Sequence, residues 1–367
     1  MPAPSSSLMS NPSFPAYAPL FELTRGQVVE SIHYGSVAVV DRQGNLLAWH
    51  GNPHTQTYLR STAKPFQALP FIEAGGPRTF GFTLQEVALI CASHDGTDEH
   101  VEVARTLQQK TGVAESDLLC GTHPATHPPT RTAMQARGET PTPNRHNCSG
   151  KHSGMLAAAR LHGWPLEDYV NPAHPLQQSI LTTFAAMCDL SPDQVSVGID
   201  GCSAPNFAVP LYHAALAYAR LCDPVDLPPA RAEACRTITH AMTTHPVMVA
   251  GPDEFDTCLM EVTGGRLVSK GGAEGYQGLG LLPGVLAPDV PGIGITLKIS
   301  DGGARPHVRS AVVMEVLRQL NVLTEREWET LRTFGPLLPV RNYRDLMVGE
   351  GRPCFTLQTA WPIAVSA

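Results

Sequence analysis

Strand-like segments lie at the two ends of this chain, and helical periodicity fills the region between them. Residues 28–41 and 46–50 are rich in β-branched and aromatic side chains, and turn residues at 42–45 separate them, which predicts a hairpin. Short strand-like runs return near the C-terminal end, at 266–269, 292–299 and 345–348. Because strands must pair to satisfy their backbone groups, we expect the two ends to form one sheet.

Helical periodicity marks most of the chain between residues 61 and 263. The predicted helices there are 63–73, 84–91, 99–111, 149–162, 175–187, 206–221 and 229–243, and two more follow at 305–320 and 324–334. The pattern predicts an α+β fold, in which a helical lobe is inserted into a mostly antiparallel sheet made by the N- and C-terminal segments.

No change in composition marks a second domain. We therefore expect one catalytic domain over residues 25–367, with a sheet part at 25–60 and 264–367 and a mainly helical part at 61–263. Residues 1–24 are rich in Pro and Ser and are expected to form a flexible tail.

Charge and apolar patterning exclude several classes of protein. The 367 residues carry 26 basic and 33 acidic side chains, a net charge of −7, and so lack the basic excess of a nucleic-acid-binding protein. No uninterrupted apolar run is long enough to span a membrane, and the first residues lack the charged start and apolar centre of a secretory signal. The nine cysteines form no CxxC pair. This usage favours reduced thiols and a cytoplasmic protein.

The first cluster with chemical potential is Arg60-Ser61-Thr62-Ala63-Lys64. If a helix begins near Ser61, residues three apart share one face, so Lys64 lies beside the Ser61 hydroxyl. A serine becomes a strong nucleophile when a neighbouring base takes its proton, and a lysine can do so when its surroundings keep it neutral. The same five residues also fit a helix cap followed by a surface lysine.

Two further segments carry similar groups. Ser93, in the turn Cys91–Asp98, follows a predicted helix, and Lys270, in Ser269-Lys270-Gly271-Gly272, ends a predicted strand. Glycines beside a strand lysine allow another backbone or a substrate to approach closely. Read individually, both segments also fit ordinary turns.

A metal site is the other chemistry that the sequence offers. Cys148 enters a predicted helix, and Cys202 lies on a predicted strand-to-helix turn. Two thiolates with a nitrogen donor suit zinc. Spacing favours His146 or His152 as that nitrogen donor, although two buried structural cysteines are an equally simple interpretation. The Gly-Lys pair at 150–151 lacks the spacing of a nucleotide-binding P-loop.

The order of these segments resembles the serine β-lactamase and penicillin-binding architecture. Two departures are that Ser93 begins no Ser-x-Asn motif and that Gly-Gly, not Thr-Gly, follows Lys270. A more specific resemblance is to the zinc-binding L-asparaginases of the Rhizobium etli inducible type, and it covers the chain from about residue 26 onward. It rests on RSTAKPFQ (60–67), CASHDG (91–96), HNCSGKHSGML (146–156), GIDGCSAPNFA (198–208), MVAGPDEFDT (248–257) and SKGGAEG (269–275).

This resemblance implies an amidohydrolase that splits the side-chain amide of L-asparagine into L-aspartate and ammonia through an acyl-enzyme. It implies one Ser–Lys pair of Ser61 with Lys64 and a second of Ser93 with Lys270. We expect Ser61 to be acylated, because its lysine shares the helical face, and Ser93 to relay protons.

The resemblance also implies a zinc ion held by Cys148, Lys151 and Cys202, so that a lysine replaces the histidine that spacing favoured. Arg60 and His152 match substrate-contacting positions, and Asp200 matches an acid that orients Lys151. A homodimer is expected on the same basis.

Three alternatives remain open at this point. A glutaminase is the nearest, because one methylene in a fitted pocket changes substrate preference by only about 1–3 kcal/mol. A serine β-lactamase or D-Ala-D-Ala peptidase is the second. A zinc-binding scaffold without activity is the third, and the presence of both serines and both lysines argues against it.

Overall fold

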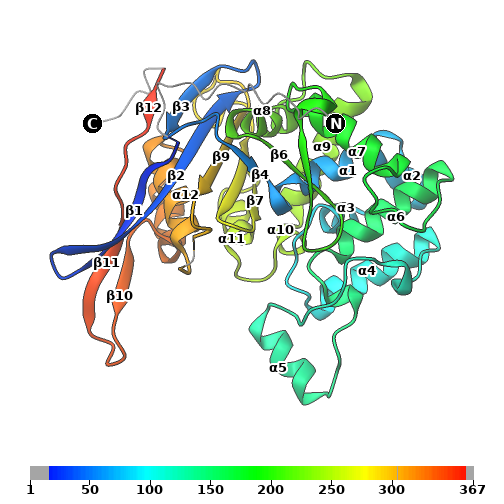
Figure 1. Ribbon diagram of the computed structural model, residues 1–367, viewed down its shortest axis with the longest axis horizontal. Coiled ribbons are helices and arrows are strands. Elements are labelled where there is room, and N and C mark those ends of the chain that lie inside the picture. The colour runs from blue at the N-terminus through cyan, green and yellow to red at the C-terminus, as the bar shows by residue number, and fades with distance from the viewer. Residues whose placement is uncertain (1–15, 304, 361–367) are drawn as a thin grey trace, which may run out of the picture.

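The computed structural model describes residues 16–303 and 305–360, and places a β-sheet part beside a helical part (Figure 1). The paired strands of the main sheet are antiparallel and follow the order β10-β11-β1-β2-β9-β8-β7, with β3 pairing with β2 and β12 with β3. Their bounds are β1 (Ala18–Arg25), β2 (Val28–Asp41), β3 (Leu46–His50), β7 (Leu267–Gly272), β8 (Tyr276–Leu281), β9 (Ile293–Ile299), β10 (Leu338–Arg341), β11 (Met347–Pro353) and β12 (Gln358–Thr359).

The predicted closure of the sheet by both ends of the chain is confirmed. Long β2 pairs with β1 through its first half and with β9 through its second half, so the N-terminal strands β1 and β2 lie between the C-terminal strands β11 and β9. The predicted hairpin is β2 with β3, in which Val37 lies opposite His50. This antiparallel sheet with a separate helical region places the chain in the α+β class.

The expected tail of residues 1–24 is too long. Residues Ala18–Arg25 form β1, which lies between β2 and β11 and buries Leu20, Phe21 and Leu23 in the core. Residues 1–15 of that prediction lie outside the described residues.

The helical part follows the predicted elements closely. Its helices are η1 (Arg60–Ala63), α1 (Lys64–Glu73), α2 (Gly76–Phe80), α3 (Leu84–Ile90), α4 (Asp98–Thr111), η2 (Glu115–Asp117), α5 (Pro128–Ala136), η3 (Pro143–Arg145), α6 (Ser149–His162), α7 (Pro175–Met187), η4 (Pro192–Gln194), α8 (Leu211–Cys222), α9 (Pro229–Thr244), α10 (Pro246–Val249) and α11 (Phe255–Val262). The C-terminal segment adds α12 (Val308–Gln319), α13 (Glu325–Leu331) and η5 (Arg332–Phe334). Helix α8 packs on β2, β8 and β9, and one cluster of buried apolar side chains runs through both parts.

A small three-stranded sheet interrupts the helical part, in the order β4-β6-β5. Its strands are β4 (Gln56–Tyr58), β5 (Ser196–Ile199) and β6 (Pro205–Pro210). The predicted helix 206–221 is therefore wrong over its first residues, because the backbone there pairs with β4 and β5 before α8 begins. Cys202 consequently lies in a turn between two strands, not between a strand and a helix.

No helix in the described ranges is long and apolar enough to cross a membrane. All nine cysteines are free thiols, and seven of them are buried.

Candidate active site

Lys64 lies at the first turn of α1, directly after η1, and is almost fully buried. Its Nζ donates to the Ser93 hydroxyl at 2.7 Å and to the Ala92 carbonyl at 2.6 Å. The predicted partner of Lys64 was Ser61, but the described residues contain no hydrogen bond between those two side chains. The loop after α3 brings Ser93 to the amine.

Ser61 faces a pocket of about 260 Å³ and hydrogen-bonds through its hydroxyl to no residue that the structure describes. Ser93 and Lys270 line the same pocket. The fold thus brings both predicted serines and one predicted lysine to one cavity, while Lys64 reaches it through Ser93. The remaining lining residues are Asp95, Asn147, Ala250, Glu254, Asp256, Gly271, Gly272, Ala273 and Arg309.

Lys270 lies near the end of β7 with 1% of its surface exposed. Its Nζ donates to the Gly271 carbonyl at 2.8 Å. Burial, followed by the nearby charge of Lys64, lowers the pKa of Lys270 to about 7, although the Asp256 carboxylate opposes this shift. A lysine in these surroundings has a large neutral fraction near neutral pH and can act as a base. The resemblance pairs Ser93 with Lys270, and both line this pocket, but no hydrogen bond joins their side chains among the described residues.

Arg60 occupies a strained position at the start of η1, with φ of 53°. Its backbone N–H donates to Asn206 Oδ1 at 3.0 Å, and its Nε donates to Asp200 Oδ1 at 2.9 Å. Left-handed backbone at a residue with a side chain costs about 1–3 kcal/mol, and such strain clusters at functional sites. The two contacts hold this conformation beside Ser61.

Asp200 was predicted to orient Lys151, and its carboxylate forms an ion pair with Arg60 at 2.9 Å. Burial is the largest influence on the pKa of Asp200 and raises it, but Lys151, the Gly201 N–H and Arg60 together lower that pKa below its usual value. The carboxylate therefore lies between both cations, as an ionised group.

Cys148, Lys151 and Cys202 converge in a buried cluster beside the pocket. Lys151 Nζ donates to Cys202 Sγ at 2.8 Å, and contact with Cys202 is the main reason that the pKa of Cys148 lies well below that of an ordinary thiol. Burial lowers the pKa of Lys151, but the two cysteines outweigh it, so that pKa is raised. Two buried sulfur donors suit zinc, and the lowered pKa of Cys148 favours the thiolate that a metal ligand requires. The raised pKa of Lys151 keeps its amine protonated beside the thiols, so Lys151 would have to lose that proton to serve as the third donor.

The histidines favoured by spacing do not join this cluster as ligands. His152 Nδ1 lies 2.6 Å from the Tyr169 hydroxyl, and His146 Nδ1 accepts from the Cys148 N–H at 3.0 Å. Within the described ranges, no three His, Cys, Asp or Glu side chains are grouped to hold a metal. His152 Nε2 is buried and makes no hydrogen bond to a described residue, but His152 does not line the pocket that holds Ser61. Burial lowers the pKa of His152, and the nearby Cys202 side chain opposes this shift.

Sequence reasoning missed Asp256 and Arg309, which line the pocket from α11 and α12. Asp256 is buried and accepts three hydrogen bonds, and Arg309 Nη1 donates to the Gly272 carbonyl at 2.8 Å. A Cβ at Gly271 would lie 2.8 Å from a guanidinium nitrogen of Arg309, so a larger residue there would displace the end of this flexible side chain. Asp256 lies within the string MVAGPDEFDT but was given no role there, and Arg309 lies in none of the quoted strings, so the fold reveals the place of both in the pocket.

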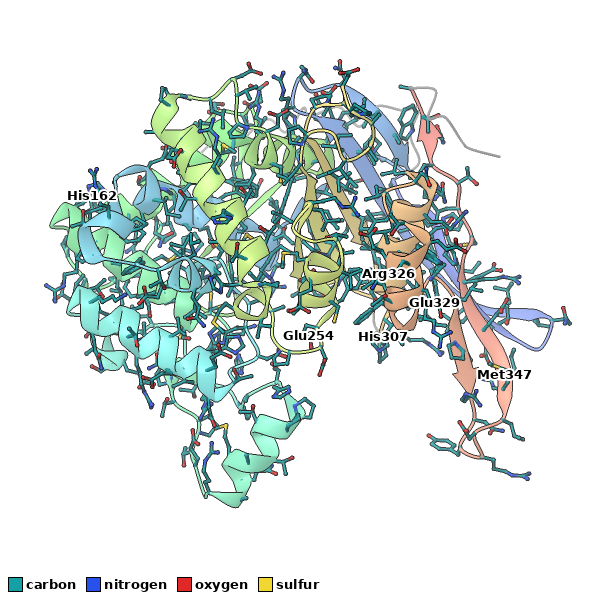
Figure 2. All side chains as sticks on the ribbon, turned by 180° about the vertical axis from the view of Figure 1, so that it is seen from behind. His162, Glu254, His307, Arg326, Glu329 and Met347 are labelled. Atoms are coloured by element: carbon teal, nitrogen blue, oxygen red, sulfur yellow. The ribbon has the colours of Figure 1, made fainter. Side chains whose placement is uncertain are left out.

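A second hollow of about 390 Å³ adjoins the pocket and shares Glu254 and Arg309 with it. His307 lines this hollow, and Figure 2 shows Glu254 and His307 at the same edge of the molecule. A larger hollow of about 500 Å³ lies between β1, β10 and β11, and it contains none of the predicted site residues. We therefore assign the chemistry to the pocket of about 260 Å³ that Ser61, Ser93 and Lys270 line.

Comparison with protein families identifies the family of this chain. The family model described as L-asparaginase II matches residues 21–353 of the chain. The chain belongs to the L-asparaginase II family. The match includes every predicted site residue, from Arg60 to Lys270, and the newly identified Asp256 and Arg309. Members of this family are amidohydrolases, so the chain is an amidohydrolase. A comparison with curated protein sequences gives no match.

The solved structures with similarity to this chain include two glutaminases. A probable glutaminase from Bacillus subtilis in complex with 6-diazo-5-oxo-L-norleucine is 12% identical, with a TM-score of 0.35, over 78% of this chain and 84% of that one. A Bacillus glutaminase in 4.3 M NaCl is 12% identical, with a TM-score of 0.38, over 78% of this chain and 91% of that one. A likeness of this size does not carry a substrate or a mechanism over to the L-asparaginase II chain.

Proposed function

We propose that this amidohydrolase is an L-asparaginase that hydrolyses L-asparagine to L-aspartate and ammonia on a scaffold of the serine β-lactamase type. One observation carries the mechanism: the unbonded Ser61 hydroxyl shares a pocket with Lys270, whose pKa of about 7 makes it a base near neutral pH. Family membership and the conjunction of the six sequence strings support asparagine as the substrate.

Acylation begins when Ser61 Oγ attacks the carboxamide carbon of the substrate. A neutral lysine in the pocket accepts the serine proton, and Lys270 is the lysine whose surroundings favour the neutral form. A Ser61 ester forms as the C–N bond breaks, and the nitrogen leaves as ammonia after taking up a proton. The hydrogen-bonded pair of Lys64 and Ser93 reaches the same pocket and is suited to relay that proton.

Deacylation uses the same groups in the reverse direction. Water enters the site that ammonia has left, and a neutral lysine takes a proton from it as the oxygen attacks the ester carbon. The C–O bond to Ser61 breaks, aspartate forms, and the serine recovers its proton.

The α-carboxylate of the substrate requires a cation at the pocket. Arg60, the predicted partner, already binds Asp200 through Nε, whereas Arg309 lines the pocket directly and has one described hydrogen bond, to Gly272. A guanidinium can bind a carboxylate through two parallel hydrogen bonds. We assign the α-carboxylate to Arg309 and a supporting contact to Arg60.

Zinc held by Cys148, Lys151 and Cys202 would supply a fixed positive charge that shapes and grips the substrate end of the site. Two thiolate ligands make a metal a weak Lewis acid, so binding is the expected contribution. The chain's own contribution is Asp200, whose ionised carboxylate lies between Arg60 and Lys151 and links the cluster to the Ser61 turn.

We also propose that the enzyme works in the cytoplasm as a homodimer. The nine free thiols support a reducing compartment. Sedimentation of the purified protein at several concentrations tests the dimer.

Ammonia release from L-asparagine, measured beside L-glutamine for the wild type and Ser61→Ala, tests the function. Release from asparagine that disappears in Ser61→Ala supports both the reaction and the nucleophile. Release from glutamine at equal or higher kcat/KM would make the enzyme a glutaminase. Release that persists in Ser61→Ala would transfer the nucleophile to Ser93, and hydrolysis of nitrocefin alone would indicate a β-lactamase.

A further inference from the structure

Asp256 is a buried carboxylate at the first turn of α11, beside β7 (Figure 1). Its Oδ1 accepts from Ser269 Oγ at 2.6 Å and from Gln277 Nε2 at 2.7 Å, and its Oδ2 accepts from the Gly271 N–H at 2.5 Å. Charge-assisted hydrogen bonds of this length are about twice as strong as neutral ones. One carboxylate therefore joins α11 to β7 and to β8.

Two of these three bonds go to the residues that flank Lys270. Successive side chains of a strand point to opposite faces, so a group that holds Ser269 and Gly271 fixes the direction in which the Lys270 side chain leaves the backbone. Gln277 lies opposite Gly271 in the β7–β8 register and also donates to Ser269 Oγ at 3.0 Å. The contacts form a closed network around the lysine.

We propose that Asp256 is a positioning residue for the amide hydrolysis: it holds both neighbours of Lys270 and thereby aims the lysine amine into the pocket beside Ser61. This inference rests on the proposed function, in which Lys270 is the base. Asp256 does not contact the reacting atoms itself; it acts through the strand.

The carboxylate also supplies charge. The charged and titratable groups that act on Lys270 come from several elements. They are Lys64 of α1, Cys91 after α3, Cys148 before α6, Glu254 and Asp256 at α11, and Arg309 of α12. Lys64 and Arg309 lower the pKa of Lys270, and Asp256 is the group that raises it most. Removing the Asp256 charge therefore lowers the pKa of Lys270 further.

The direction in which the pKa of Lys270 changes distinguishes a positioning role of Asp256 from a merely structural one. If neutral Lys270 is the base, kcat/KM falls as the pH drops through its pKa. In Asp256→Asn that acid limb should move to lower pH, while kcat falls at least about tenfold because the amine is misaligned. A destabilised enzyme would lose activity without any movement of the limb.

The experiment measures the titration of the Lys270 amine directly by NMR, in addition to the pH dependence of activity. The chain has few lysines, namely Lys64, Lys110, Lys151, Lys270 and Lys298, so the Cε resonance of Lys270 can be followed by NMR in protein labelled with ¹³C-lysine and assigned with Lys270→Met. Ser269→Ala is the matched control, because it removes one hydrogen bond to Asp256 and leaves the charge. We expect a lower titration midpoint in Asp256→Asn and an unchanged midpoint in Ser269→Ala.

Different results would refute the proposed asparaginase function and the positioning role of Asp256. A wild type that releases no ammonia from asparagine would refute the proposed function, while the NMR titration would still test the coupling of Asp256 to Lys270. An unchanged Lys270 midpoint in folded Asp256→Asn, or wild-type kcat in that variant, would overturn the inference.

A second variant keeps the inference testable if Asp256→Asn does not fold. The double variant Ser269→Ala with Gln277→Leu removes two of the three hydrogen bonds and keeps the carboxylate. It should lower kcat at least about tenfold with KM within about threefold and the acid limb in place. Wild-type kcat in this double variant would refute the positioning role.

Discussion

The amine of Lys64 donates a 2.7 Å hydrogen bond to the hydroxyl of Ser93, 29 residues further along the chain. This bond joins the first turn of α1 to the loop after α3. Because the lysine is buried and also donates to the Ala92 carbonyl, its position is fixed from two sides. Ser61, one helical turn earlier, keeps an unbonded hydroxyl in the same pocket. The arrangement assigns attack to Ser61 and proton relay to the Lys64–Ser93 pair.

Replacing the relay serine should slow chemistry without abolishing binding. In Ser93→Ala we expect kcat to fall by about 10²–10⁴, the usual contribution of a positioned proton-transfer group, with KM within about threefold. Ammonia release under saturating asparagine measures the effect. Ser196→Ala removes an exposed hydroxyl that accepts from Gln56 and should keep wild-type kcat. A wild-type rate in Ser93→Ala would remove this residue from the mechanism.

The acid limb of the pH profile should report Lys270. Its pKa of about 7 predicts that kcat/KM rises with pH through about pH 7, because the neutral amine is the active form. Lys270→Arg keeps a cation in the pocket that cannot deprotonate, and we expect a loss of at least about 10² in kcat at all pH values tested. A normal rate with an unmoved limb in Lys270→Arg would assign the base to Lys64.

Local signals account for the elements that the sequence predicted well. Helix α6 has the predicted bounds, Ser149–His162, since Gly163 ends it in the left-handed conformation that favours glycine. Helix α7 also matches, because Pro175 stands at its first position. The segment that begins at Asn206 is mostly apolar and fits both a strand and a helix. Its first residues form a strand because they pair with β4 and β5.

The candidate site was predictable only in part, because contacts between elements far apart in the sequence also decide its geometry. Spacing within one helix suggested Ser61 for Lys64, but a buried amine takes the nearest acceptor in space, and Ser93 comes from a different element. Asp256 resembles an ordinary acid in the first turn of a helix. Its burial and its three hydrogen bonds depend on how α11 packs against β7 and β8, which no short motif encodes.

The cysteine cluster should be required for metal binding. We expect Cys148→Ser and Cys202→Ser to purify with little or no zinc, because oxygen ligands replace soft thiolates poorly. Elemental analysis of each variant gives the metal content, and asparaginase assays should show a raised KM with kcat close to that of the wild type. Cys354→Ser, which changes a half-buried free thiol near β11, should keep full metal content. Zinc at wild-type stoichiometry in both cluster variants would refute the site.

Recognition of the α-carboxylate should depend on Arg309. A charge-assisted hydrogen bond contributes about 1.5–3 kcal/mol, so Arg309→Met should raise KM for L-asparagine by about 10- to 100-fold. The same variant should leave KM nearly unchanged for 3-aminopropanamide, which has the amide and the amine of asparagine but no carboxylate. Arg318→Met is the matched control on α12, because that arginine pairs with Glu315 and is more than half exposed. Equal effects of Arg309→Met on both substrates would assign the arginine a structural role at Gly272, and Arg60 would then be the remaining cation for the carboxylate.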